Sequence, residues 1–224
     1  MVPIDESNGR CTRRRTRCAY LGVACLAALL GATAAAAEAE GRWDLELGGG
    51  VLLFSPNVAK IPRGESETAL DPLVELSLGR HVSDRLELRL SFAHASGAES
   101  DWKSEDDQGT AVIPTPSVTS AFVALETPLL PGGGRLVPHA GVGVGFVSFS
   151  EVDESIRFDW GTHVTNNRIR FGGHTDASIL FDLGVRARLR APLGLVTRYR
   201  LISAFDNEQV NTVDRVTLTL RVDW

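Results

Sequence analysis

The sequence predicts an all-β protein, an eight-stranded antiparallel up-and-down transmembrane β-barrel. Three observations lead to this fold class. The last ten residues alternate between apolar and polar side chains and end on Trp224. Comparable alternating segments, each roughly ten residues long, recur along the chain. The connections between these segments are long and short in turn. Because a strand points successive side chains to opposite faces, each segment has one apolar and one polar face.

The C-terminal segment, residues 215–224, shows this alternation most clearly. Its apolar face carries Val216, Leu218, Leu220, Val222 and Trp224, and its polar face carries Arg215, Thr217, Thr219, Arg221 and Asp223. In a transmembrane barrel the apolar face meets lipid, the polar face lines the interior, and a terminal Trp lies at the water interface. A soluble barrel fills its interior with apolar side chains instead. A soluble periplasmic β-domain is the alternative fold.

Residues 1–37 are predicted to be a cleaved signal peptide, and residues 38–224 the barrel domain. Five arginines within residues 10–17 precede an apolar stretch at 18–31, and small residues follow up to Ala37. That order is typical of a secretory signal, and the apolar stretch is shorter than the roughly 20 residues that a membrane-spanning helix needs. All three cysteines (Cys11, Cys18 and Cys25) lie in this segment, so the mature chain is expected to lack disulfides and thiol chemistry.

The charge balance argues against nucleic acid as a partner. The formal net charge is −5, and removal of residues 1–37 takes away five arginines but only two carboxylates, which leaves a more acidic chain. An acidic exported protein is poorly suited to binding nucleic acid. No hydrophobic helix remains after processing, so a membrane role has to come from strands.

In the first half of the barrel domain, strands are expected at 43–53, 74–79, 86–92 and 117–129. The first strand alternates apolar residues with Asp44, Glu46 and glycines, and the third alternates without a break. Phe122 interrupts the alternation of the fourth strand. The connections are a polar loop at 55–68, a tight turn at 82–84 and a long acidic loop at 95–116.

In the second half, strands are expected at 139–146, 177–190, 198–205 and 215–224. Glycines at 141, 143 and 145 occupy inward positions of the fifth strand, which indicates close packing or room for long arginines from across the lumen. The longest loop, 151–174, contains Ile-Arg-Phe twice, at 156–158 and 169–171, and is expected to form a hairpin beyond the membrane. Short turns at 131–134 and 191–194 and a link at 206–209 complete the chain.

The chain resembles the small eight-stranded outer-membrane barrels, the OmpA-, OmpX- and OmpW-like superfamily. The resemblance rests on size, strand count, short turns at one end with long loops at the other, and the terminal pattern Val216-x-Leu-x-Leu-x-Val-x-Trp224. It implies the outer membrane of a Gram-negative bacterium, contact with outer-membrane lipid and lipopolysaccharide, and recognition of the C-terminal strand by the barrel-assembly machinery. Most members end in Phe, so Trp224 is a departure, and no motif assigns a subfamily.

Inward-facing charged residues are the main candidates for a functional role. A charge network in the lumen is expected from Glu46, Glu75, Glu87, Arg89, Glu126, Asp182, Arg186, Arg188, Arg198, Arg200 and Arg221. The other inward positions with titratable side chains are Asp44, His139, Arg190 and Asp223. Eight strands enclose a lumen just wide enough for side chains to fill, and an unpaired buried charge is costly, so these charges are expected to pair across it.

The network is expected to act as a salt-bridged plug in a barrel with a structural or surface-interaction role. The alternative is a narrow arginine-lined path for ions or small solutes. Trp43 and Trp224 are expected to anchor the barrel at the membrane interface. The sequence predicts neither a transported solute, nor a loop ligand, nor an oligomeric state.

His94-Ala-Ser96 is the one hint of catalysis. It resembles the His-x-Ser pair of the lipid A 3-O-deacylase barrels, in which His acts as the base on a Ser hydroxyl, and Glu99 or Glu105 could orient the His. However, that family's motif lies near its C-terminus, and Gly97 stands where the family has Asn. A histidine at the level of the lipid headgroups is the preferred interpretation, and the protein is expected not to be an enzyme.

No metal or cofactor is predicted. The acidic loop at 99–107 clusters carboxylates that suit a hard cation, but it lacks spaced ligands around a central Gly. His163 and His174 are isolated, and the sequence contains no phosphate-binding loop and no zinc signature.

Overall fold

The computed structural model describes residues 42–54, 64–66, 69–83, 85–104, 109–130, 134–205 and 210–224. The predicted signal peptide, most of the polar loop at 55–68 and the link at 206–209 lie outside the described residues. Within the described ranges, no helix has the length and apolar character needed to cross a membrane.

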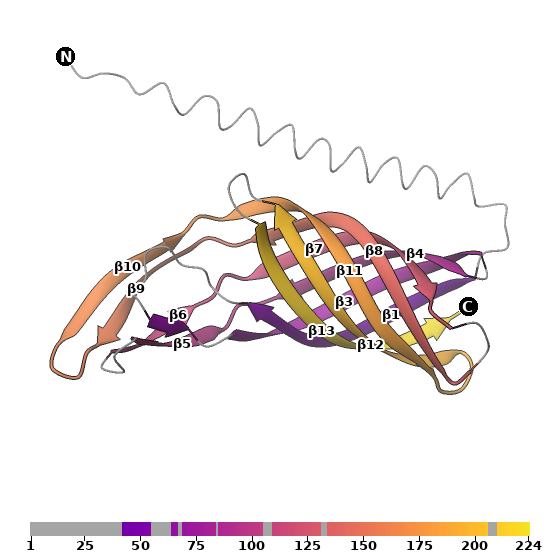
Figure 1. Ribbon diagram of the computed structural model, residues 1–224, viewed down its shortest axis with the longest axis horizontal. Helices are drawn as coiled ribbons and strands as arrows, with labels where there is room; N and C mark the ends of the chain where they lie inside the picture. Colours follow the sequence, from indigo (N-terminus) through magenta and orange to yellow (C-terminus); the bar gives the residue numbers. More distant parts are fainter. Residues whose placement is uncertain are drawn as a thin grey trace, which may run out of the picture. The chain divides into compact units, whose positions relative to one another are not determined.

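Eight strands close into an antiparallel barrel in the order β1-β13-β12-β11-β8-β7-β4-β3 (Figure 1). They are β1 (Trp43–Phe54), β3 (Ala69–Ser83), β4 (Leu86–Ala95), β7 (Val118–Pro128), β8 (Leu136–Phe149), β11 (His174–Arg188), β12 (Leu193–Phe205) and β13 (Val210–Asp223). Each strand pairs with the barrel strands before and after it in the chain, and β1 pairs with β13 to close the ring. The predicted fold class is confirmed.

The three long connections leave the barrel at one end, here called the loop end, which also has the short link between β12 and β13. The other three short connections lie at the opposite turn end (Figure 1). At the turn end the first and last strands are joined by two backbone hydrogen bonds. Trp43 N donates to Trp224 O at 3.0 Å, and Trp224 N donates to Trp43 O at 2.9 Å. The two predicted interface residues therefore lie side by side at the closing seam.

The outward face of the barrel is a belt of large apolar side chains. Its exposed members include Leu45, Leu47, Val74, Leu76, Leu78, Leu90, Phe92, Leu125, Val142, Val144, Phe146, Phe181, Leu183, Val185, Val216, Leu218 and Leu220. Soluble monomers rarely expose a continuous apolar surface larger than a few hundred Å². This belt has the character of a lipid-facing band.

The barrel interior has two chemically different halves. Charged side chains fill the half near the turn end. Apolar side chains fill the half near the loop end, where the buried cluster is Leu52, Leu73, Ala93, Ala95, Val118, Phe122, Ala124, Val147, Phe149, Leu180, Ile202 and Val213. The sequence analysis expected a polar interior throughout, which is wrong for the loop-end half, because there the strands carry apolar residues on both faces.

Phe122 explains why apolar and polar side chains do not alternate strictly along β7. Its side chain is 1% exposed and points into the barrel, opposite Gly145 of β8. A Cβ placed on Gly145 would lie 2.7 Å from the Phe122 ring. One of the inward glycines of β8 thus provides the space for an aromatic ring rather than for an arginine.

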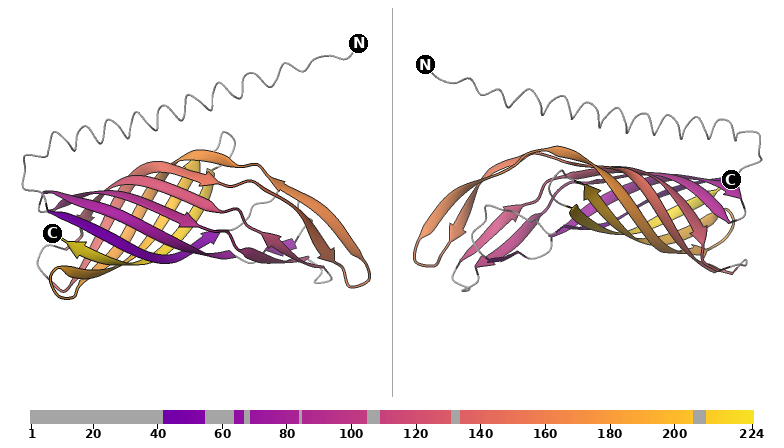
Figure 2. Two further views of the ribbon diagram at one scale, coloured as in Figure 1. Left: turned by 180° about the vertical axis from the view of Figure 1, so that it is seen from behind. Right: turned by 45° about the horizontal axis from the view of Figure 1, so that its top comes forward.

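A second, five-stranded sheet continues beyond the loop end, as both views in Figure 2 show. Its order is β10-β9-β6-β5-β2, with β2 (Gly64–Ser66), β5 (Glu99–Ser104), β6 (Thr110–Pro114), β9 (Val152–Asp159) and β10 (Val164–Phe171). The β9–β10 hairpin confirms the one predicted within 151–174. The acidic stretch 95–116, predicted to be a loop, instead forms the β5–β6 hairpin.

This loop sheet has its own apolar core, which explains the second hairpin. Trp102 of β5 packs edge-on against Phe158 of β9, with ring centroids 5.2 Å apart, and against Trp160 at 5.9 Å. Ala111, Ile113, Ile156 and Ile169 complete the buried cluster. Alternation in β5 places Trp102 inside, while Glu99 and Asp101 stay exposed.

Candidate functional site

Six carboxylates and six guanidinium groups meet in the turn-end half of the barrel, among the described residues. This charge cluster consists of Asp44, Glu46, Glu75, Glu87, Glu126 and Asp182 with Arg89, Arg186, Arg198, Arg200, Arg215 and Arg221. All are buried except Arg186, whose side chain is 14% exposed. The formal charges cancel, which is what burial in a region of low dielectric requires.

Arg89 and Glu46 are the centre of the charge cluster. Arg89 lies 2.8 Å from Asp44, 3.1 Å from Glu46 and 3.1 Å from Glu126, and it also contacts Glu87. Glu46 in turn accepts a hydrogen bond of 2.9 Å from Nη2 of Arg198, whose Nη1 contacts its other oxygen. Strands β1, β4, β7 and β12 are thereby joined through the interior by two side chains.

Arg221 and Arg186 complete the cluster towards the turn end. Arg221 lies 3.1 Å from Asp44 and 3.2 Å from Glu87, and Arg186 lies 3.0 Å from Glu87. The half-buried ring of His81 is 3.1 Å from Arg221 and 3.6 Å from Glu87. These contacts close the cluster on the side nearest to the Trp43–Trp224 seam.

Arg200 and Arg215 complete the cluster towards the apolar half. Arg200 bridges Asp182 of β11 and Glu75 of β3 across the barrel. Arg215 lies 3.7 Å from Glu75 and donates a 3.1 Å hydrogen bond to the Ser120 hydroxyl. Arg215 therefore marks the boundary between the charged and the apolar section.

Gly79 of β3 makes room for the densest part of the cluster. A Cβ at this position would come 2.1 Å from Asp44 Oδ2 and 2.7 Å from Arg89 Nη2. Gly184 plays the same part for His139, whose ring atoms would be 2.6 Å from an added Cβ. Small residues on the inner wall are thus needed where large charged side chains cross the lumen.

Ten of the eleven residues predicted for the network lie in the charge cluster. The exception is Arg188, the last residue of β11, which is exposed at the turn end beyond the buried pairs. Arg190 and Asp223 are also exposed there, although Arg221 reaches Asp223 at 2.6 Å. The sequence analysis placed Arg215 on the interior face of the last strand together with Arg221, but did not include it in the charge network.

Trp43 and Trp224 lie at the turn end, where the prediction placed interface anchors. The guanidinium carbon of Arg80 lies over the Trp43 ring, 5.2 Å from its centroid. Trp224 is 61% exposed. An exposed indole beside a cation–π pair is chemically suited to a membrane–water interface.

The residues of the possible catalytic pair do not meet within the described part of the chain. His94 is exposed on the outer face of β4, and its Nδ1 lies 2.9 Å from the Thr119 hydroxyl on β7. No hydrogen bond joins His94 to Ser96 among the described residues. Glu99 belongs to the loop sheet, and Glu105 lies outside the described residues.

One group of side chains within the described residues has the spacing of a metal site. Ligand atoms of Asp44, His81 and Glu87 lie within 4.8 Å of one another. Both carboxylates are already bound by Arg221 at 3.1 and 3.2 Å. A cation would have to displace this guanidinium group, so the donors do not fit a resident metal.

No family model and no curated protein sequence matches this chain. Among solved structures, Neisserial surface protein A is 12% identical, with a TM-score of 0.51, over 83% of this chain and all of its own. The N-terminal β-barrel domain of Pseudomonas aeruginosa OprF is 12% identical over 82% of this chain and 97% of its own, with a TM-score of 0.45. Ail of Yersinia pestis, solved in complex with the heparin analogue sucrose octasulfate, is 10% identical over 83% of this chain and 99% of its own, with a TM-score of 0.45. This protein therefore has the fold of the small eight-stranded outer-membrane β-barrels.

Proposed function

We propose that this protein is a closed outer-membrane barrel that anchors an interaction surface, the loop sheet, on the outside of the cell. Short turns face the periplasm and long loops face the exterior in barrels of this kind. The loop sheet would then project from the membrane, with the apolar belt in lipid and lipopolysaccharide around it. The C-terminal strand β13 would be the segment that the barrel-assembly machinery recognises.

The observation that carries the proposal is the burial of the lumen charges. Side chains that line a water-filled channel are accessible to solvent, whereas Arg89, Arg198 and Arg200 are 0–1% exposed. Their partners Glu46 and Asp182 are equally buried. Towards the loop end, Phe122, Leu180 and Ile202 fill the apolar half. Two filled layers in series favour a plug over the alternative of a narrow solute path.

The test is single-channel conductance in planar lipid bilayers. We expect the wild-type barrel to be electrically silent, and the double variant Arg198→Ala/Arg200→Ala to open a leak, because two large side chains that cross the lumen are removed. Faster gel migration of unboiled samples would show that both proteins are folded barrels. Steady wild-type conductance whose ion selectivity changes in the double variant would instead establish the arginine-lined pore.

A further inference from the structure

An opening interrupts the loop sheet between β6 and β9. The ladder between β7 and β8 ends at Val118 and Phe149, and one more bond follows, from Ser150 N to Ser117 O at 2.9 Å. Beyond it, β6 and β9 pair at a single position, Thr110 with Asp159. Between these two closures, residues 111–116 and 151–158 form no ladder with each other, and both stretches lie within the described part of the chain.

The β6 and β9 sides of the opening stay unpaired because they differ in length. Thr110 lies eight residues before Val118, whereas Asp159 lies ten residues after Phe149, so the β9 side is two residues longer between the same two closures. The β6 side also contains Pro114 and Pro116, which have no N–H to donate to a ladder. Residue-by-residue pairing therefore cannot continue across this part of the sheet.

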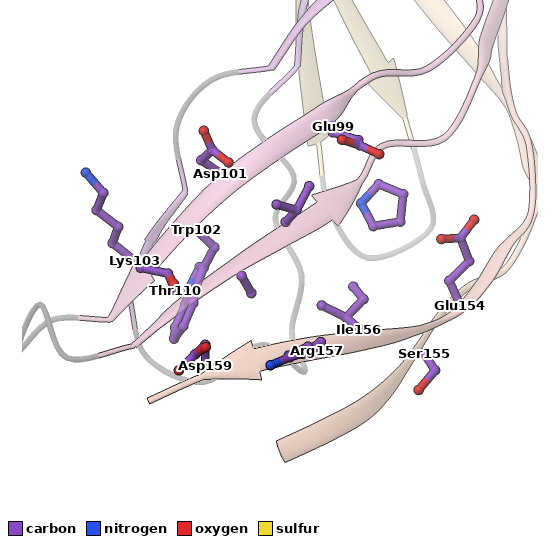
Figure 3. A pocket seen from close by; sticks show the side chains of 13 residues that line it. Glu99, Asp101, Trp102, Lys103, Thr110, Glu154, Ser155, Ile156, Arg157 and Asp159 are labelled. Carbon is purple, nitrogen blue, oxygen red and sulfur yellow. The ribbon is translucent and has the colours of Figure 1, made fainter. Parts of the chain in front are cut away.

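The opening contains a cavity of about 510 Å³ (Figure 3). This volume lies in the range of small-molecule sites, which hold roughly 300–1,000 Å³. Since the sheet is closed at both ends of the opening, an extended peptide could not run through it as an added strand. The size and the closure favour a small ligand.

The lining combines apolar surface with an excess of negative charge. Trp102, Val112, Pro114 and Ile156 supply apolar contacts. Four carboxylates line the cavity, those of Glu99, Asp101, Glu154 and Asp159, against two cations, Lys103 and Arg157. Figure 3 shows Glu99 and Glu154 extending into the opening from the two different hairpins. Neither has an ion-pair partner among the described residues.

One residue of the cavity lining, Trp102, carries a buried hydrogen-bond donor. Trp102 is 1% exposed, and its indole N–H has no acceptor among the described residues. A buried donor is normally paired. A ligand with an oxygen acceptor near the indole would supply the missing partner.

We propose that this opening binds a small organic cation, an amine whose apolar body carries a hydrogen-bond acceptor. The ammonium group is held by Glu99 and Glu154, the apolar body lies against Ile156 and Val112, and the acceptor receives the Trp102 N–H. This assignment rests on the proposed function of the loop sheet as an interaction surface and names the class of ligand for it.

Titration calorimetry on the full barrel in uncharged detergent tests the assignment with matched probes. Tyramine has the amine, the ring and a phenolic oxygen. Tyrosol replaces the amine with a neutral hydroxyl, and 2-phenylethylamine lacks the phenolic oxygen. We expect saturable binding of tyramine, at least tenfold weaker binding of tyrosol, and weaker binding of 2-phenylethylamine.

Two variants of the β9 region separate the site from general charge effects. Glu154→Gln should weaken tyramine binding about three- to fivefold, because one partly exposed ion pair is lost. Glu151→Gln removes the same charge from a residue outside the cavity lining and should leave the affinity unchanged. Trp102→Phe, which keeps an aromatic ring in the core, should remove the advantage of tyramine over 2-phenylethylamine.

Absent binding, equal affinity for tyramine and tyrosol, or equal effects of Glu154→Gln and Glu151→Gln would overturn the assignment. The proposed function has an independent readout in conductance and in the mobility of unboiled samples. A silent, heat-modifiable barrel that does not bind tyramine would refute the ligand class and leave the closed barrel intact.

Discussion

Arg89 contacts four carboxylates at once, on β1, β4 and β7. The energetic contribution of such a cluster cannot be divided into separate ion pairs, because each guanidinium group neutralises several neighbouring carboxylates in a region that excludes water. A buried ion pair adds little over apolar packing, whereas removal of one partner leaves uncompensated charge behind. The importance of Arg89 therefore lies in what its loss would expose.

Arg89→Met should lower the free energy of unfolding by about 3 to 5 kcal/mol, because it leaves four buried carboxylates short of a counter-charge. Reversible urea unfolding from lipid vesicles would measure the change. Arg188→Met makes the same substitution at an exposed position of β11 and should change stability by no more than about 0.5 kcal/mol. Similar losses in the two variants would show that the cluster is not electrostatically coupled.

At the scale of elements, the β9–β10 hairpin has a polar clamp on its exposed face. Arg168 donates to both carboxylate oxygens of Asp153, from Nε at 2.6 Å and from Nη2 at 2.8 Å. The Arg168 guanidinium beside Asp153 holds the pKa of that carboxyl below its usual value of 3.8. Arg170 and Glu151 form a second, looser pair at 3.1 Å. The hairpin is thus joined by its core residues on one face and by ion pairs on the other.

Acid should loosen this hairpin through Asp153. Since the folded-state pKa is lowered, the stabilisation is present above the unfolded-state value of 3.8 and is lost as the pH falls through the folded-state pKa. Amide hydrogen exchange of residues 152–171, followed between pH 6 and roughly pH 2, should show this loss. In the Asp153→Asn variant, the amides of this hairpin should exchange rapidly at both ends of the pH range. If the variant instead kept the acid response of the wild type, the effect would belong to other groups.

At the scale of the whole molecule, the barrel reverses the usual arrangement of polar and apolar surface. Its outer wall is apolar, its turn-end interior is charged, and only the loop-end interior and the loop sheet have cores of the ordinary apolar kind. An apolar wall of this kind favours an environment in which lipid or detergent covers it. The Trp43–Trp224 seam, the apolar belt and the loop sheet follow one another from the turn end outwards.

A charge on the apolar belt should be costly in proportion to its depth. Leu218→Arg, in the middle of β13 on the outer face, should destabilise the barrel by about 2 to 4 kcal/mol, whereas Leu136→Arg, at the first residue of β8, should cost about 0 to 1 kcal/mol. Both leucines are exposed to the surroundings of the barrel. Equal costs in vesicle unfolding would contradict a lipid-covered belt.

The sequence by itself determined the eight barrel strands and the lipid-facing side. Side-chain alternation is a local property of an extended chain, so Val216, Leu218 and Leu220 could be assigned to one face without knowledge of their neighbours. The same parity placed Glu46, Arg89 and most of the charge cluster inside. The assignment by alternation failed at Phe122. This aromatic side chain points inward because Gly145 on the neighbouring strand leaves space for its ring, and such packing between two strands is not visible in the alternation of one strand.

Only the tertiary structure decided which side chains meet. The partners of Arg89 depend on how three strands are staggered around the ring, and the apolar loop-end half depends on strand ends that are apolar on both faces. The β5–β6 hairpin forms because Trp102 packs against Phe158 of a different hairpin, which no local pattern in an acidic segment encodes. The opening beside it follows from the two-residue difference between two ladders. Each of these features depends on contacts between segments that are far apart in the chain, whereas alternation depends only on residues that are adjacent in the sequence.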